Sequence, residues 1–162
     1  MADIRHNDYI RLTANYLRDL AYDKGAVDNL TSRIKELKET LADVSTKIVG
    51  YEEKQGGQGE LTPVEAEAEK RIADEKILSR CNKDLRKMQY HIFRVEKALD
   101  LLGEEDRQAL ILHYCDRRSY EDIANILKWS PRTCNRRVKE GTKLVAYMLF
   151  GDKAKENVYF VC

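Results

Sequence analysis

Positively charged side chains are concentrated in one short segment of the sequence, residues 128–143. Six of them lie within this segment, with the single acid Glu140 among them: Lys128, Arg132, Arg136, Arg137, Lys139 and Lys143. The whole chain of 162 residues has a formal net charge of +1, so the concentration is local. Guanidinium and ammonium groups bind phosphate oxygens, and arginine and asparagine side chains can form paired hydrogen bonds with guanine and adenine edges. The segment therefore has the chemistry to contact a nucleic acid.

Three short helices are expected between residues 104 and 150, and they position these side chains. The first begins with three acids, where the helix dipole favours negative charge, and continues towards Cys115. Ser119 and Asp122 form the pattern of a capping box at the start of the second helix. Ser130 caps the third, which opens with a proline because that position needs no N–H donor. The sequence KWS between the last two helices is a tight turn.

The second and third helices together form the pattern of a helix-turn-helix. We expect its inner apolar face to consist of Ile123, Ala124, Leu127, Cys134, Val138, Leu144, Met148 and Leu149. The recognition helix, over residues 131–149, would enter the major groove of DNA with its N-terminal half. Its expected outward residues are Arg132, Thr133, Asn135, Arg136 and Lys139. Solvation alone also explains a basic helix face, but the position in the second helix of a correctly spaced pair favours DNA contact.

Two longer apolar seams precede this module. The first arm is expected at about residues 8–53, with apolar residues alternately three and four apart: Val27, Leu30, Ile34, Leu37, Leu41, Val44, Ile48 and Tyr51. The second is expected at about residues 62–102, with the seam Leu78, Cys81, Leu85, Met88, Ile92, Val95, Leu99 and Leu102. A glycine-rich turn at residues 55–61 separates the arms, and Thr62 is expected to cap the second one. Gly25 is expected to loosen or bend the first.

The seams predict a long antiparallel helical hairpin, a coiled coil, in an all-α fold. The expected domains are the hairpin at residues 1–103 and the helix-turn-helix at 104–150, followed by a tail at 151–162. Two helices bury only part of a wide apolar stripe, and Tyr22, Ile77 and Tyr90 are left over. The hypothesis is a homodimer or higher oligomer formed through the hairpin, with a monomer as the alternative.

Other classes of protein lack support in the sequence. Its four cysteines are widely spaced, with no C-x-x-C pair and no histidine at ligand spacing, so we expect no metal and no other cofactor. No basic region followed by an apolar run opens the chain, and no stretch approaches the ~20 apolar residues of a membrane span. We expect a soluble cytoplasmic protein. The sequence shows no glycine-rich phosphate loop, no nucleophile motif and no isolated pair of carboxylates. We therefore do not expect an enzyme.

The stretch "LLGEEDRQALILHYCDRRSYEDIANILKWSPRTCNRRVKEGTKLVAYML", residues 101–149, resembles region 4 of the sigma-70 family of transcription initiation factors. "SYEDIANIL" is similar to the family's S-Y-E-E-I-A-x-x-L, and "SPRTCNRRV" to its S-x-x-T-V-x-x-R-L. A long helical hairpin followed by this module resembles small phage or prophage proteins, described as sigma-70 region 4-like or as regulators of the ArpU and RinA type. The resemblance implies a phage-encoded transcription regulator.

The resemblance also assigns roles to residues. Thr133 and Arg137 fall where the family contacts the DNA backbone, and four others fall where it reaches bases or nearby phosphates: Arg132, Asn135, Arg136 and Lys139. Lys128 and Lys143 complete the expected DNA-binding set. The turn departs from the family, because Lys128 and Trp129 replace its usual glycine and small apolar residue. We expect Trp129 to pack against the helix pair. No region 2 is recognisable, so a complete sigma factor is not expected.

The leading hypothesis is therefore a sequence-specific regulator of transcription that binds double-stranded DNA, with bacterial RNA polymerase as a further partner and the cytoplasm of a bacterial host as its location. One alternative is an interaction protein that binds host polymerase or another partner without reading DNA. A second is a small terminase subunit, which combines a helix-turn-helix with a coiled coil and would form a ring-like oligomer.

Overall fold

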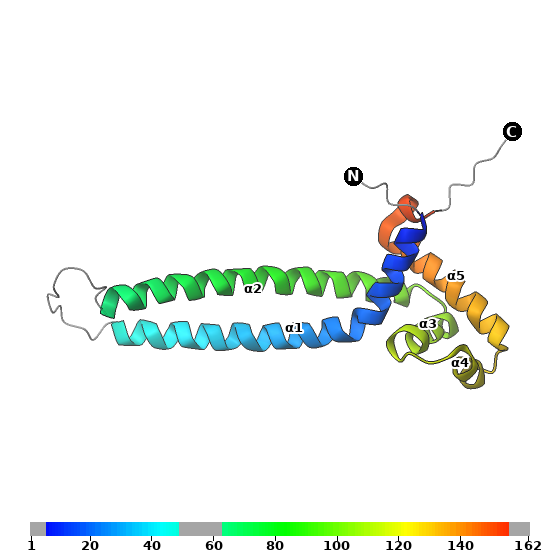
Figure 1. Ribbon diagram of the computed structural model, residues 1–162, viewed down its shortest axis with the longest axis horizontal. Helices are drawn as coiled ribbons and strands as arrows, with labels where there is room; N and C mark the ends of the chain where they lie inside the picture. The colour runs from blue at the N-terminus through cyan, green and yellow to red at the C-terminus, as the bar shows by residue number, and fades with distance from the viewer. Residues whose placement is uncertain (1–5, 49–62, 156–162) are drawn as a thin grey trace. The chain divides into compact units, whose positions relative to one another are not determined.

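The computed structural model describes residues 6–48 and 63–155, and every element in these ranges is a helix (Figure 1). In chain order they are α1 (His6–Ile48), α2 (Pro63–Asp100), α3 (Glu104–Leu110), the π-helix η1 (Ile111–Cys115), α4 (Tyr120–Leu127), α5 (Pro131–Phe150) and the 3-10 helix η2 (Gly151–Ala154). The predicted all-α fold, with a long helical hairpin ahead of a helix-turn-helix, is confirmed. In the described ranges no helix has both the length and the apolar character needed to cross a membrane.

The chain forms two compact units. One unit comprises Met1–Lys24 and Tyr90–Cys162, and the other comprises Gly25–Gln89. We call them the helix-turn-helix unit and the hairpin unit. The first takes in the start of α1 and the end of α2, so the boundary expected at Gly103 lies inside it. Gly25 falls at the boundary between the units, and α1 is helical on both sides of it.

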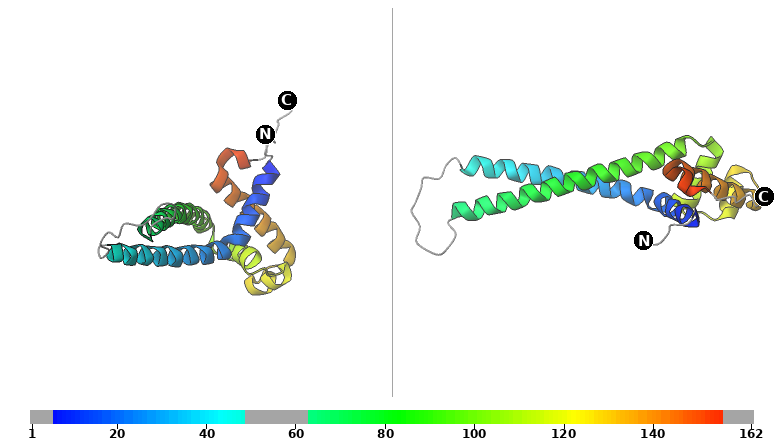
Figure 2. Two further views of the ribbon diagram at one scale, coloured as in Figure 1. Left: turned by 60° about the vertical axis from the view of Figure 1, so that its left-hand side comes forward. Right: turned by 90° about the horizontal axis from the view of Figure 1, so that it is seen from above.

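The hairpin unit consists of antiparallel segments of α1 and α2 (Figure 2). Ile34 on α1 and Cys81 on α2 are buried, with exposed fractions of 6% and 8%. The neighbouring seam positions are half-buried: Val27, Leu30, Leu37, Leu41, Leu78, Leu85 and Met88. The alternating spacing of three and four thus identified the shielded side of each helix. The predicted turn at residues 55–61, the cap at Thr62 and the end of the first arm lie outside the described residues.

The N-terminal part of α1 belongs to the core of the helix-turn-helix unit. Leu17 is 1% exposed, and its carbonyl accepts a hydrogen bond from the Cys115 thiol at 3.3 Å. The ring of Tyr9 lies 5.1 Å from that of Phe150, at the end of α5. Arg94, near the end of α2, donates a hydrogen bond to the carbonyl of Leu149. Segments far apart in the sequence therefore share one core, an association that helical periodicity does not reveal.

The helix expected between residues 104 and 115 changes its hydrogen-bonding pattern along its length. It is α-helical as α3 and becomes the π-helix η1 for its last turn. Within this segment the Tyr114 hydroxyl donates to Thr142 Oγ1 at 3.0 Å, and Thr142 in turn donates to the carbonyl of Val138 at 2.7 Å. The tyrosine hydroxyl is thus paired inside an otherwise apolar core, where an unpaired hydroxyl is costly.

Gly141 lets α3 approach α5 closely. A Cβ atom at this position would lie 3.2 Å from Leu110 Cδ1, which is tighter than ordinary van der Waals contact. Glycine in a helix interior costs about 1 kcal/mol relative to alanine. Here the missing side chain allows the close packing of Leu110, which is 1% exposed.

The expectation that Leu144 and Met148 face inward is wrong. They are 51% and 37% exposed. The buried face that begins at Cys134 and Val138 continues instead through Gly141, Thr142, Val145, Ala146 and Leu149. Steps of three and four from Val138 reach these residues, whereas Leu144 and Met148 lie on another side of the helix.

We expect Leu17→Ala to lower the free energy of unfolding by roughly 2–4 kcal/mol, because it removes a buried side chain from a packed core. Thermal or urea unfolding of the full chain measures the change. Asn15→Ala, at an exposed position of the same helix, should have little effect. Equal stabilities of the two variants would contradict the placement of α1 in this core.

Candidate nucleic-acid interface

The helices α4 and α5 are joined by a turn of three residues (Figure 1). Lys128 ends α4 in the left-handed conformation, with a φ of 57°. The N–H of Trp129 then donates to the carbonyl of Ala124 at 2.9 Å, which closes the end of the helix. A lysine here occupies backbone geometry that glycine adopts without strain, so the conformation of Lys128 carries a cost in free energy that a glycine would not.

Side-chain caps fix the first residue of each helix. Ser119 Oγ accepts from the Asp122 N–H at 3.1 Å, and the Asp122 carboxylate accepts from the Ser119 N–H, completing the predicted capping box. Ser130 Oγ accepts from the N–H of Thr133 at 3.1 Å, and a proline follows it at the start of α5. Both predicted caps are confirmed. They determine where α5 begins and hence which of its residues lie in the first turns.

The inner faces of the two helices are tightly packed. Ile123 and Cys134 are 0% exposed and Val138 is 1% exposed, while Leu127 is half-buried. Burial raises the pKa of the Cys134 thiol, so this cysteine remains a neutral packing residue. The packing leaves the opposite side of α5 available for contacts outside the unit.

Most of the predicted DNA-binding side chains lie on the exposed side. The exposed members are Lys128, Arg132, Arg136, Lys139 and Lys143. Arg136 lies 3.9 Å from the carboxylate of Glu140, in a pair whose side chains are 66% and 58% exposed. Such an exposed pair contributes little to stability and leaves the guanidinium available to an anion. Five of the eight predicted residues thus have the accessibility that phosphate or base contact requires.

Two polar residues of the first turns are half-buried. Thr133 shares a hydrogen bond of 2.9 Å with the Ser130 hydroxyl and so forms part of the cap of α5. The side-chain oxygen of Asn135 is buried and has no hydrogen-bond partner within the described part of the chain. A buried amide oxygen without a partner costs free energy, so this side chain is poised to gain from a hydrogen-bonding ligand or a rotation on binding.

Arg137 is held inside the unit more firmly than its neighbours. Its guanidinium lies 4.5 Å from the centre of the Trp129 ring. Its Nη1 atom donates to carboxylate oxygens of Glu105 and Asp106, both at 3.2 Å. The predicted packing of Trp129 is confirmed, with Arg137 as its partner. A phosphate approaching Arg137 would have to compete with two carboxylates.

The geometry of α4, the turn and α5 defines a helix-turn-helix, a class of domain that binds DNA. Residues 80–144 match the family model described as sigma-70, region 4. No curated protein and no solved structure matches the chain. The chain therefore contains a sigma-70 region 4-like helix-turn-helix, as the motifs of its sequence predicted.

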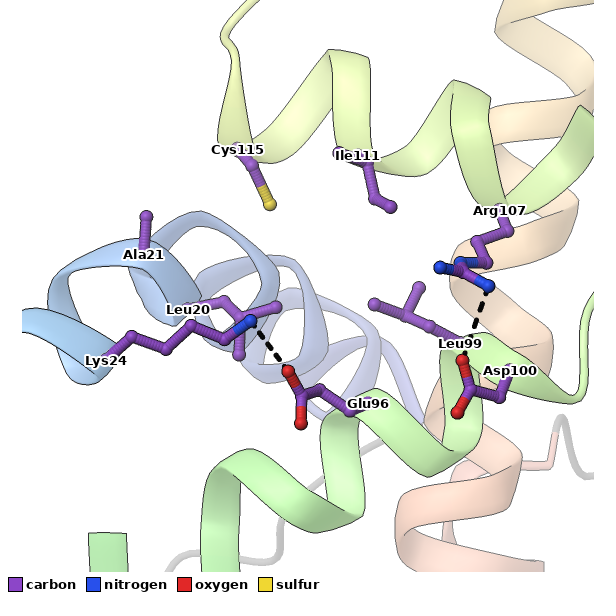
Figure 3. Close-up of a pocket in the computed structure, with 9 residues that line it drawn as sticks. All are labelled: Leu20, Ala21, Lys24, Glu96, Leu99, Asp100, Arg107, Ile111 and Cys115. Atoms are coloured by element: carbon purple, nitrogen blue, oxygen red, sulfur yellow. Dashed lines mark ion pairs between the residues drawn. The ribbon is translucent and has the colours of Figure 1, made fainter. Parts of the chain in front are cut away.

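A pocket elsewhere in the helix-turn-helix unit has no lining residue from α4 or α5 (Figure 3). Its apolar lining includes Leu20, Leu99 and Ile111. Two ion pairs lie beside them, Lys24 with Glu96 at 2.6 Å and Arg107 with Asp100 at 3.4 Å. Because these residues come from four elements, no local pattern in the sequence indicates the pocket. Its ion pairs link the start of α1 to α2 and α2 to α3.

An aromatic cluster connects η1 to the first residue of α4. The His113 ring stacks on Tyr120 at 4.6 Å and meets Tyr114 edge-on at 4.7 Å. His113 Nδ1 donates to the carbonyl of Arg118, and Nε2 lies 3.4 Å from the Tyr120 hydroxyl. Burial is the main cause that lowers the pKa of His113, although the hydrogen bond to Arg118 opposes the shift.

Replacing Arg137 with alanine should lower the free energy of unfolding by about 1–2 kcal/mol, because it removes the cation–π interaction and the partly exposed ion pairs. Trp129 is the only tryptophan, so its fluorescence reports the change during chemical denaturation. Arg136→Ala is the matched control at an exposed position of the same helix. If both variants unfold alike and the Trp129 emission is unchanged, Arg137 does not hold the turn.

The stability of the unit should fall as the pH drops through and below about 6.5, the ordinary pKa of histidine. Because the pKa of His113 is lowered in the folded state, the unfolded state binds more protons in this range, and acid favours unfolding. Thermal unfolding at several pH values should show a smaller acid-induced loss for His113→Gln than for the unchanged protein. An equal loss in both would exclude His113 as the cause.

Proposed function

We propose that this chain is a sequence-specific, DNA-binding transcription regulator, encoded by a phage and acting in the cytoplasm of its bacterial host. The observation that carries the proposal is the exposed basic face on α5, the second helix of a sigma-70 region 4-like helix-turn-helix. Arg132, Asn135, Arg136 and Lys139 contact base edges or nearby phosphates, and Lys128, Thr133, Arg137 and Lys143 contribute to the backbone contacts. The protein needs no metal, no other cofactor and no catalytic residue for this role.

The proposed complex places the N-terminal half of α5 in the major groove of double-stranded DNA. The Ser130 side chain accepts a hydrogen bond from the Thr133 N–H and so fixes the start of the helix, whose first two turns present a defined set of side chains. Arginine forms bidentate contacts with guanine, and asparagine with adenine. The half-buried Asn135 amide is suited to base contact, since its oxygen gains a partner when it turns to the groove.

We further propose that the protein is a homodimer formed through the hairpin. Ile72 and Ile77 of α2 are 53% and 39% exposed, and apolar residues at this exposure supply area for a second copy. A dimer would contact two half-sites on DNA. Sedimentation discriminates the alternatives, because a small terminase subunit would form a larger, ring-like oligomer.

A second candidate is a protein that binds bacterial RNA polymerase without reading DNA. It is favoured by Leu144, Tyr147 and Met148, which are exposed on the C-terminal half of α5. Tyr147 and Met148 lie three and four positions after Leu144, a spacing suited to contact along one helix face. Polymerase contact by these residues is also compatible with DNA contact by the first turns of α5.

Binding to fragments of the source genome tests the proposal, at near-physiological salt and with excess non-specific competitor. We expect selective retention of one or a few fragments. The double variant Asn135→Ala and Arg136→Ala should lose this selectivity. Each bidentate contact that is removed should lower the free energy of discrimination between the preferred fragment and other fragments by roughly 1–3 kcal/mol. Asn29→Ala with Arg33→Ala is the matched control, because it removes the same two residue types from exposed positions of α1.

The control should bind like the unchanged protein. Retention that is unselective, or selective retention that survives the Asn135 and Arg136 changes, would refute base reading by α5. Binding to polymerase in the absence of any DNA selectivity would favour the second candidate.

A further inference from the structure

A second cluster of positive charge lies in the hairpin unit, well apart in sequence from the recognition helix. Four basic residues recur along α2 at intervals of four, three and four: Lys76, Arg80, Lys83 and Lys87. All four are exposed. We call them the basic stripe. Asp84 is the single acid between the first and last of them.

The spacing places the basic stripe on one face of α2. At 3.6 residues per turn the four positions fall within about 60° around the helix axis, and they extend over about 16 Å. The seam of α2 is on the opposite side, since Cys81 is buried and Leu78, Leu85 and Met88 are half-buried. The stripe therefore points away from the surface that the hairpin shields, and its side chains have no structural role in that seam.

The charges of the stripe are not neutralised within the described chain. No ion pair in residues 6–48 and 63–155 involves any of its four members. Elsewhere in the unit, charges are paired along the helix, as in Arg71 with Glu75 at 3.2 Å and Lys35 with Glu39 at 3.9 Å. Like charges three or four residues apart destabilise a helix by about 0.2–0.5 kcal/mol per pair. The stripe contains three such neighbouring pairs, an arrangement that an anionic partner would relieve.

We propose that the basic stripe binds the phosphate backbone of double-stranded DNA and adds a sequence-independent contribution to the affinity of the protein. This inference rests on the proposed function, which makes duplex DNA the polyanion that the protein meets. Repeated positive charge along one helix face is complementary to the regular negative charge of a duplex. Three of the four members of the stripe are lysines, whose ammonium group binds phosphate as a point charge.

The salt dependence of DNA binding tests the stripe. Removing one phosphate-binding side chain lowers the slope of log K against log salt concentration by about 0.9 for duplex DNA. We therefore expect Lys83→Gln with Lys87→Gln to reduce the slope by up to about 1.8 and to weaken binding to specific and non-specific duplexes by the same factor. Lys83→Arg with Lys87→Arg retains the charge and should retain the slope.

The matched control is Lys38→Gln with Lys70→Gln, which makes the same change in net charge at two exposed positions of the same unit that form no ion pair within the described residues. It should leave the slope unchanged. The glutamine variant of the stripe should also unfold no more easily than the unchanged protein, because like-charge pairs are removed. Weaker binding can then be separated from misfolding.

Each remaining outcome decides against one of the proposals. An unchanged slope in both glutamine doubles, with selective binding intact and sensitive to Asn135 and Arg136, would overturn the stripe and leave the proposed function standing. If the stripe variant and the control variant lose the same affinity for duplex DNA, the effect follows from net charge alone and the proposal for the stripe is wrong. If the unchanged protein binds no duplex at low salt, the proposed function itself fails.

Discussion

The packing of the inner face of α5 is the constraint on which the helix-turn-helix depends. Cys134, Val138 and Val145 on this face are almost entirely inaccessible to solvent. Close contact at Gly141 brings Leu110 of α3 against the same face. One side of the helix is thus buried along most of its length, and rotation about its axis would expose that apolar surface. The polar side chains on the other side are therefore held in a fixed direction.

Polar interactions refine the position that this packing establishes. The cap at Ser130 fixes the first residue of α5, and Arg137 connects the helix to the turn through Trp129 and to α3 through two carboxylates. The cation–π contact and ion pairs of Arg137 stabilise the turn. Arg132 and Arg136 on the same helix are more exposed and remain accessible to a ligand.

Charge is distributed differently in the two compact units. In the helix-turn-helix unit, basic residues on α5 accompany amide and hydroxyl groups near the helix start, and such a mixture can distinguish bases. In the hairpin unit, the basic stripe lacks this mixture and repeats with the helix period, which suits contact with a uniform polyanion. The net charge of +1 for the whole chain does not reveal these two basic surfaces, because acidic residues elsewhere in the sequence balance their positive charge.

Much of this organisation could be predicted from residue types and their spacing. The caps at Ser119 and Ser130 and the shielded seam around Ile34 follow from hydrogen bonds and periodicity that act over a few residues. Contacts between distant segments set the remainder: the burial of Leu17 beside Cys115, the π-helical turn, the partners of Arg137 and the exposure of Leu144 and Met148. Local rules state which groups need a partner or a buried surface, whereas only the packed chain determines which distant residue supplies it.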